Sequence, residues 1–249
     1  MNWNYVVGLL STIALSLPIL TIIATKLYGY RSFPALLFYY LIVVGDNFLT
    51  QGYIHADTSF IRYYGITNNL LETPLILIFL TYFSTSSELT RRMKILTAAF
   101  AAYEIIIVSI FGFTRNAITI TTGCGLLLIL SFCVIFFVRQ TKITIMHRKA
   151  TGKALIAGSF LFSFGCYSII YLMYYIFKTP KAETFLIYFL VTIFSSMLIC
   201  AGIVIERKRV LKLNELKLTR KELSIVYKDN TPTVPIKTIT LDFDQEQWN

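Results

Sequence analysis

Seven apolar stretches, each about as long as a membrane-spanning helix, constrain the fold of this chain more than any other feature. They lie at roughly 5–27, 33–54, 63–85, 93–113, 117–138, 153–177 and 183–205. A helix rises about 1.5 Å per residue, so about 20 apolar residues cross the hydrocarbon core of a bilayer. The strands of a membrane barrel would alternate over about ten residues, and these stretches do not. The pattern predicts an all-α, polytopic membrane protein with a bundle of seven transmembrane helices.

The composition supports a membrane protein. Hydrophobic residues make up 56% of the 249 residues and charged residues only 14%, with a mean hydropathy of +0.66. Soluble domains carry about 25% charged residues. The net charge of +10 has no soluble basic domain to carry it. We therefore expect the lipid bilayer to be a partner and nucleic acid not to be one.

Lysine and arginine residues predict the orientation, because they accumulate in cytoplasmic loops. With the N-terminus outside, the outer loops hold only Arg62, Arg115, Lys178 and Lys181. The inner segments are more basic and include Lys26, Arg31, Arg91, Arg92, Lys94, Arg139, Lys142, Arg148, Lys149 and Lys153. The prediction is N-out and C-in. The chain has no N-x-S/T glycosylation site, which fits a bacterial inner membrane.

Two regions are expected: a transmembrane domain over 1–205 and a basic cytoplasmic tail over 206–249. The tail pattern predicts a helix to about 228, either on the inner leaflet or in a short coiled coil. Residues 234–244 alternate apolar and polar side chains, as a strand does. This last part is either disordered or adds to the sheet of a cytosolic protein partner.

Three carboxyl groups lie well inside the predicted spans, and they are the main functional signal. They belong to Asp46, Glu72 and Glu104, and no lysine or arginine lies at comparable depth. An acid at the centre of a membrane helix costs about 2.5–3.5 kcal/mol, so such residues usually face a polar interior. Counted from the span ends at 1.5 Å per residue, all three lie roughly 10–14 Å below the outer boundary. The shared depth predicts a shared site.

Helical spacing adds neighbours to these acids. Asn68 shares a face with Glu72, and the last two spans carry polar stripes that include Tyr167, Tyr171, Tyr188 and Thr192. Together they predict an acidic, tyrosine-rich pocket in the outer half of the bundle. Such a pocket suits a small cationic or hydroxylated ligand, a lipid, or proton transfer. The alternative is that these groups only hydrogen-bond one another and hold helices together.

Other patterns exclude several functions. The last span has no lysine for a retinal Schiff base, and the two histidines, His55 and His147, fall in predicted loops on opposite sides. The four cysteines form no C-x-x-C pair. No phosphate-binding loop, nucleophile elbow or dinucleotide fingerprint is present. We therefore expect no metal and no cofactor.

The function that the sequence favours is a receptor-like or sensor-like module, in which the pocket signals through the tail. One alternative is a small membrane enzyme that uses a buried carboxylic acid on a lipidic or isoprenoid substrate. Another is an assembly subunit that docks a partner through its tail, and proton-coupled transport also stays open. The sequence leaves open whether the protein is an enzyme.

Overall fold

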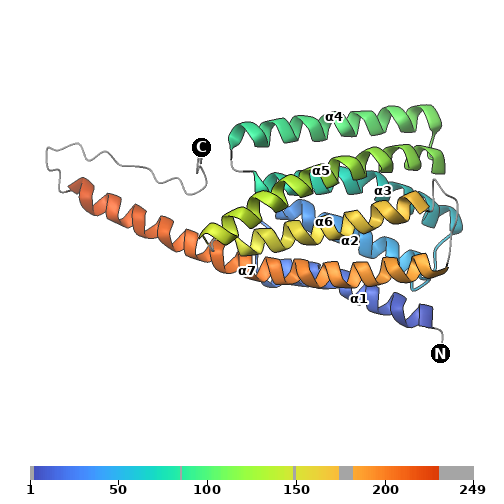
Figure 1. Ribbon diagram of the computed structural model, residues 1–249, viewed down its shortest axis with the longest axis horizontal. Coiled ribbons are helices and arrows are strands. Elements are labelled where there is room, and N and C mark those ends of the chain that lie inside the picture. Colours follow the sequence, from blue (N-terminus) through green and yellow to red (C-terminus); the bar gives the residue numbers. More distant parts are fainter. Residues whose placement is uncertain (1–2, 85, 148–149, 174–181, 230–249) are drawn as a thin grey trace.

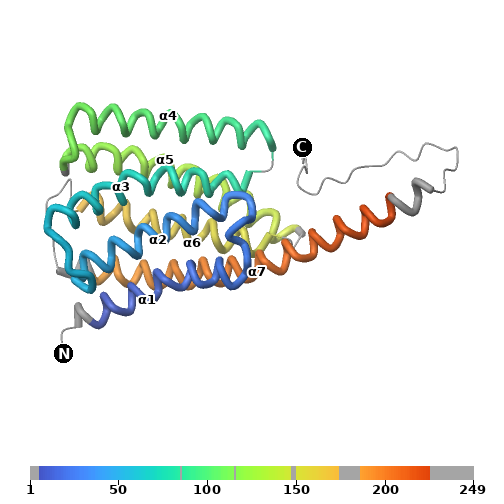
Figure 2. The backbone as a smooth tube through the Cα atoms, turned by 180° about the vertical axis from the view of Figure 1, so that it is seen from behind, coloured from blue at the N-terminus to red at the C-terminus, as the bar shows by residue number. Residues whose placement is uncertain are grey.

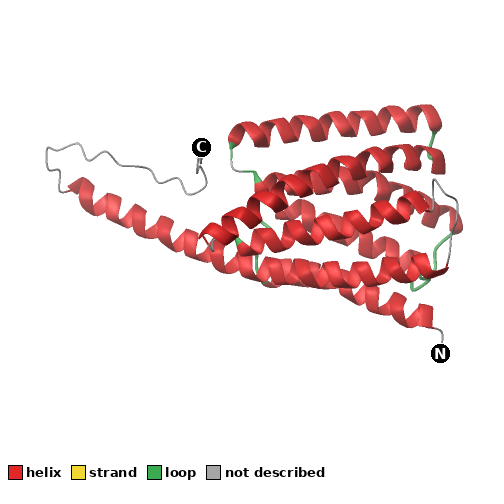
Figure 3. Cartoon of the chain, in the orientation of Figure 1, coloured by secondary structure: helices red, strands yellow, loops and turns green. Residues whose placement is uncertain are grey.

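The computed structural model describes residues 3–84, 86–147, 150–173 and 182–229, and these residues form helices and short connections (Figure 3). Seven α-helices in this part of the chain are long and apolar enough to cross a membrane, which confirms the predicted all-α class. A short 3₁₀ turn, Thr81–Phe83, follows the third helix. The helices are α1 (Trp3–Ala24), α2 (Phe33–Thr50), α3 (Thr58–Leu80), α4 (Ser87–Phe111), α5 (Arg115–His147), α6 (Thr151–Tyr171) and α7 (Ala182–Asp229).

Polar caps move two helix starts upstream of the predicted spans. Asp57 accepts a hydrogen bond from the Ser59 amide at 3.3 Å, so α3 begins five residues before position 63. The Ser86 hydroxyl accepts from the Leu89 amide at 3.1 Å, so α4 begins six residues before position 93. A side-chain oxygen at such a position satisfies an amide that the helix itself leaves unpaired. The apolar runs mark the membrane-spanning part and not the whole helix.

The predicted loop after the fifth span is wrong for residues 139–147. The α5 helix continues through them to His147, although they include charged side chains. A helix satisfies its own backbone hydrogen bonds, so it can extend beyond an apolar segment while polar side chains face solvent. The strand-like segment 234–244 lies outside the described residues.

Six of the seven helices form a closed ring, and α4 lies outside it (Figures 1 and 2). Around the ring, α1 packs on α2, α2 on α3, α3 on α5, α5 on α6, α6 on α7, and α7 on α1. The α4 helix packs only against α3, α5 and the 3₁₀ turn among the main contacts, and it is the least buried of the seven. The last helix continues beyond the bundle as a single projecting helix (Figure 1).

Aromatic side chains fill the core near the end of the bundle from which α7 projects. Phe33, Phe79 and Tyr82 pack with ring centroids 5.1–6.2 Å apart, two of the three pairs edge-to-face. Such ring pairs add about 0.5–1.5 kcal/mol beyond the area that they bury. Further fully buried rings of this region are Phe83, Phe136, Phe160 and Phe164.

Small residues let α6 and α7 approach closely. A Cβ atom added at Gly152 would lie 2.8 Å from the Glu206 amide nitrogen and 2.9 Å from the Gly202 carbonyl oxygen. About two turns further along α6, the Ser159 hydroxyl donates a hydrogen bond to the Ser195 carbonyl of α7 at 2.7 Å. Small residues and hydroxyls are the usual means of packing membrane helices.

We expect Gly152→Ala to destabilise the bundle by about 1–3 kcal/mol, because its methyl group meets backbone atoms that cannot move aside. Thermal unfolding of the purified protein in detergent measures the effect. Gly165→Ala, on the same helix with nothing within 4 Å, is the matched control and should be neutral or slightly stabilising. Equal melting temperatures for both variants would contradict the close approach.

Candidate functional site

Helices α2 and α3 place two of the three predicted carboxyl groups next to polar partners. The Tyr39 hydroxyl of α2 donates a hydrogen bond to Glu72 Oε1 of α3 at 3.2 Å. Two turns after Tyr39 on α2, Asp46 accepts a hydrogen bond at Oδ2 from Asn68 Nδ2 of α3 at 3.4 Å. Asp46 and Glu72 also interact with each other electrostatically. The two acids therefore form one site between α2 and α3.

Helices α6 and α7 supply a tyrosine pair beside these acids. The rings of Tyr167 on α6 and Tyr188 on α7 stack with centroids 5.4 Å apart. The Tyr167 hydroxyl shares a hydrogen bond of 3.0 Å with the hydroxyl of Thr192, one turn after Tyr188. Tyr167 and Tyr188 both lie within range of the negative charge that Glu72 carries when it is ionised.

These groups from four helices make up the polar cluster, which consists of Tyr39, Asp46, Asn68, Glu72, Tyr167, Tyr188 and Thr192. Tyr39 connects its two halves, because it bonds Glu72 and also interacts with Tyr167 and Tyr188. Among the described residues, neither a lysine nor an arginine takes part in these hydrogen bonds. The cluster therefore consists of two carboxyl groups surrounded by hydroxyls, ring faces and one amide.

The structure leaves Glu104 and Tyr171 outside this cluster. Glu104 is 7% exposed on α4, yet among the described residues no hydrogen bond or ion pair reaches its carboxyl group, and it has no electrostatic interaction with Glu72. The Tyr171 hydroxyl donates to the Thr119 carbonyl of α5 at 2.6 Å. Tyr171 thus joins α6 to α5, although it lies one turn after Tyr167 on the same side of α6.

The depth predicted for Glu104 is nevertheless close to that of Glu72. Thr73, next to Glu72, lies directly against Gly125 of α5. Tyr103, next to Glu104, lies 3.6 Å from the Cys124 sulfur, also on α5. Glu72 and Glu104 are therefore near the same level of α5. They differ in the side of the bundle that they occupy, because Glu72 is on α3 within the ring and Glu104 is on α4 outside it.

A second cluster, which the sequence did not suggest, lies where α7 leaves the bundle. This charged cluster consists of Tyr82, Lys153, Glu206 and Arg209. Arg209 donates from Nε and Nη2 to Glu206 Oε1 at 2.9 and 2.7 Å, and the Tyr82 hydroxyl donates to the same oxygen. The Lys153 nitrogen lies 4.6 Å from the centre of the Tyr82 ring, within cation–π range.

Three of the four residues of the charged cluster are almost completely buried, whereas the Arg209 side chain is 29% exposed. Glu206 is 1% exposed, Tyr82 is 2% and Lys153 is 7%. The second carboxylate oxygen of Glu206, Oε2, is buried without a hydrogen-bond partner among the described residues. Glu206 opens the run Glu206-Arg207-Lys208-Arg209, which the sequence places at the start of the basic cytoplasmic tail. The spacing of three between Glu206 and Arg209 was the available signal for an ion pair.

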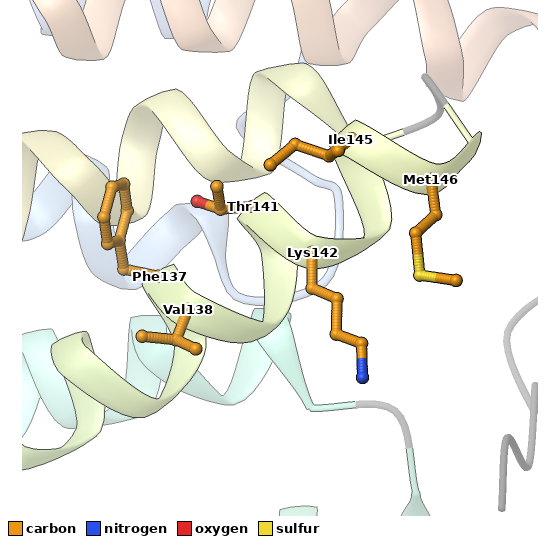
Figure 4. Close-up of a pocket in the computed structure, with 6 residues that line it drawn as sticks. All are labelled: Phe137, Val138, Thr141, Lys142, Ile145 and Met146. Atoms are coloured by element: carbon orange, nitrogen blue, oxygen red, sulfur yellow. The ribbon is translucent and has the colours of Figure 1, made fainter.

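The two grooves that the structure describes lie away from the polar cluster. One follows a single face of the second half of α5, as Figure 4 shows, and is lined by Phe137, Val138, Thr141, Lys142, Ile145 and Met146. The other lies between α4 and α5 and is lined by Phe100, Tyr103, Cys124, Leu127 and Leu128. Neither groove has a residue of the polar cluster in its lining, so neither gives a ligand access to Asp46 or Glu72.

In the described parts of the chain, no three histidine, cysteine, aspartate or glutamate side chains come together in a way that could hold a metal ion. Comparisons with known protein families, with curated proteins and with solved structures found no match for the chain. The site is therefore interpreted from its own residues.

Proposed function

We propose that the protein is a receptor-like or sensor-like integral membrane module, in which the polar cluster receives the signal and α7 carries it to the tail. One observation carries this proposal. The α7 helix supplies Tyr188 and Thr192 to the polar cluster and continues unbroken to Asp229. Any change in the cluster that shifts or rotates α7 is therefore passed along one continuous helix of 48 residues, about 72 Å long.

The signal that suits the cluster best is protonation of Asp46 or Glu72. An ionised carboxylate only accepts hydrogen bonds, whereas a protonated one also donates. Proton uptake by Glu72 would change its bond with Tyr39 of α2, and it would remove a negative charge close to Asp46 of α2, Tyr167 of α6 and Tyr188 of α7. A small cationic ligand is the alternative signal.

The proposed orientation is N-out and C-in, in a bacterial inner membrane. The basic residues support it, because Arg91 and Arg92 at the start of α4, Lys142 near the end of α5 and the run from Arg207 in α7 belong to the same end of the bundle. The polar cluster then lies in the outer half, and the charged cluster lies at the cytoplasmic boundary.

The proposal predicts a pH response in the projecting part of α7 that depends on Glu72. A spin label at Thr219→Cys, an exposed position, would be placed in protein whose four native cysteines are replaced by alanine and that is held in lipid nanodiscs. We expect the spectrum to change between acid and neutral pH, and the change to disappear in Glu72→Gln, which cannot ionise.

Two further variants make this test decisive. Glu88→Gln removes an exposed carboxylate that pairs with Arg92 at the start of α4, so it should keep the response. Tyr39→Phe removes the hydroxyl that donates to Glu72 while keeping the ring. This variant takes the place of Glu72→Gln in the test if Glu72→Gln does not fold. A spectrum that changes equally in wild type, Glu72→Gln and Tyr39→Phe would refute the role of the cluster.

A further inference from the structure

A regular stripe of exposed apolar side chains runs along α7. Its five members are spaced seven residues apart and are 45–60% exposed. The stripe begins among the apolar residues of the helix and continues into the projecting part without changing its spacing. These residues, called the α7 stripe, are Leu190, Met197, Val204, Leu211 and Leu218.

The α7 stripe faces away from the bundle. Ile199 and Glu206 are buried against other helices, and each lies five residues before a stripe residue. Five residues turn an α-helix by about 140° beyond a full turn, so the stripe lies on nearly the opposite side. The chain's own helices therefore leave this side of α7 uncovered.

Lipid can cover the first part of the stripe, but not the part that projects from the bundle. Val210 is the last buried residue that the structure describes on α7, and residues 211–224 are exposed or half-exposed. The projecting segment extends away from the bundle in both backbone views (Figures 1 and 2). A helix of about 20 residues without a partner is only marginally stable in water, and exposed leucines do not help it.

We infer that the α7 stripe is the contact surface for a second copy of this chain, with the two α7 helices parallel. A spacing of seven keeps a stripe facing one partner helix along its whole length, as in a coiled coil. Membrane insertion orients both copies in the same direction, so their stripes meet at the same height. A two-fold axis along the membrane normal then matches each residue with its own counterpart.

The charges beside the stripe fit this pairing. With Leu211 and Leu218 at the first core position of the heptad, Lys217 and Glu222 take the two flanking positions that face each other across a parallel dimer. Lys217 of one copy thus lies opposite Glu222 of the other. Asn214 and Lys221 take the second core position, where polar side chains lower stability but favour a single register. This pairing does not depend on the role proposed for the polar cluster.

Disulfide cross-linking of single-cysteine variants tests the inference in the full chain. The variants Leu211→Cys and Leu218→Cys, in protein lacking the four native cysteines, would be oxidised in membranes and in nanodiscs. A disulfide requires the two Cα atoms to be within about 7 Å. We expect a dimer band that is severalfold stronger for these variants than for the matched controls Leu216→Cys and Leu223→Cys. The controls are also exposed leucines, but each lies five residues beyond a stripe position.

The pairing also predicts the effect of charge on the stripe. The double variant Leu211→Lys/Leu218→Lys should lose the dimer in native mass spectrometry, whereas Leu216→Lys/Leu223→Lys should keep it. All four positions are exposed beyond the bundle, so each double variant should keep the melting temperature of the wild-type bundle. Equal cross-linking on both faces, stronger cross-linking at 216 and 223, or a monomer in native membranes would overturn the inference.

Discussion

Replacing Glu206 by alanine is expected to lower the free energy of unfolding by about 3–5 kcal/mol, which is the usual cost of removing one partner from a buried ion pair. Glu206 Oε1 accepts hydrogen bonds from Arg209 and Tyr82, and Lys153 lies on the ring of that tyrosine. Without the carboxylate, Lys153 stays 93% buried and loses the negative charge of the cluster. Chemical unfolding of the purified chain in nanodiscs measures the loss.

An exposed ion pair on α4 provides the control for this variant. Glu88 pairs with Arg92 at 2.5 Å, but both side chains are about three-quarters exposed. Because water screens such a pair, Glu88→Ala should change the free energy of unfolding by less than about 1 kcal/mol. If Glu206→Ala cost no more than Glu88→Ala, the charged cluster would not hold α6, α7 and the 3₁₀ turn after α3 together.

A double variant separates the loss of the ion pair from the loss of packing. Glu206→Gln combined with Arg209→Met removes both charges and keeps side chains of similar size. Replacing a buried ion pair with uncharged groups of similar volume is often neutral or stabilising. We therefore expect the double variant to be more stable than Glu206→Ala, and the two single changes to be non-additive because their side chains are in contact.

The seven helices could be predicted because the length of an apolar run is a local property of the sequence. Their ends could not be read from hydropathy alone. The starts of α3 and α4 depend on Asp57 and Ser86, whose side chains cap amides outside the apolar runs. The end of α5 was placed too early because charged residues after Arg139 resemble a loop, although a solvent-facing helix tolerates them equally well.

The polar cluster could be predicted in part, because a carboxyl group in a membrane helix has few stable places other than the interior. Asp46, Asn68 and Glu72 come together with the tyrosines of α6 and α7. Glu104 was assigned to the same site from depth alone. Depth does not give the helix face or the neighbouring helix, and α4 lies outside the ring.

The charged cluster could not be predicted, because its burial depends on packing between distant segments. Glu206 lies in a run of charges, which by itself indicates a solvated helix. It is buried because Gly152 of α6 lies against its backbone and against Gly202 of α7. That contact brings Lys153, the next residue of α6, to Glu206, and Tyr82 reaches the same site from the 3₁₀ turn. Only the tertiary structure combines residues 82, 153 and 206 into one site.

A proline in the projecting part of α7 is expected to separate the bundle from the tail. Leu213→Pro removes one backbone hydrogen bond and places the ring against the preceding turn, at a cost of about 3 kcal/mol to the helix. Position 213 lies three residues after Val210, the last buried residue described on α7, so the bundle itself should keep its melting temperature. The spin label at residue 219 should lose its response to pH, because the helix between it and Thr192 is broken.

The alanine variant at the same position distinguishes the helix break from the loss of the leucine. Leu213→Ala keeps the helix and should keep the pH response, since alanine has the highest helix propensity. A label that still responds in Leu213→Pro would mean that the signal does not travel along a continuous α7. If Leu213→Pro instead lowered the melting temperature as much as Glu206→Ala, the projecting segment would be part of what stabilises the bundle. In that case, the contact between two copies along the α7 stripe would contribute to the stability of the bundle.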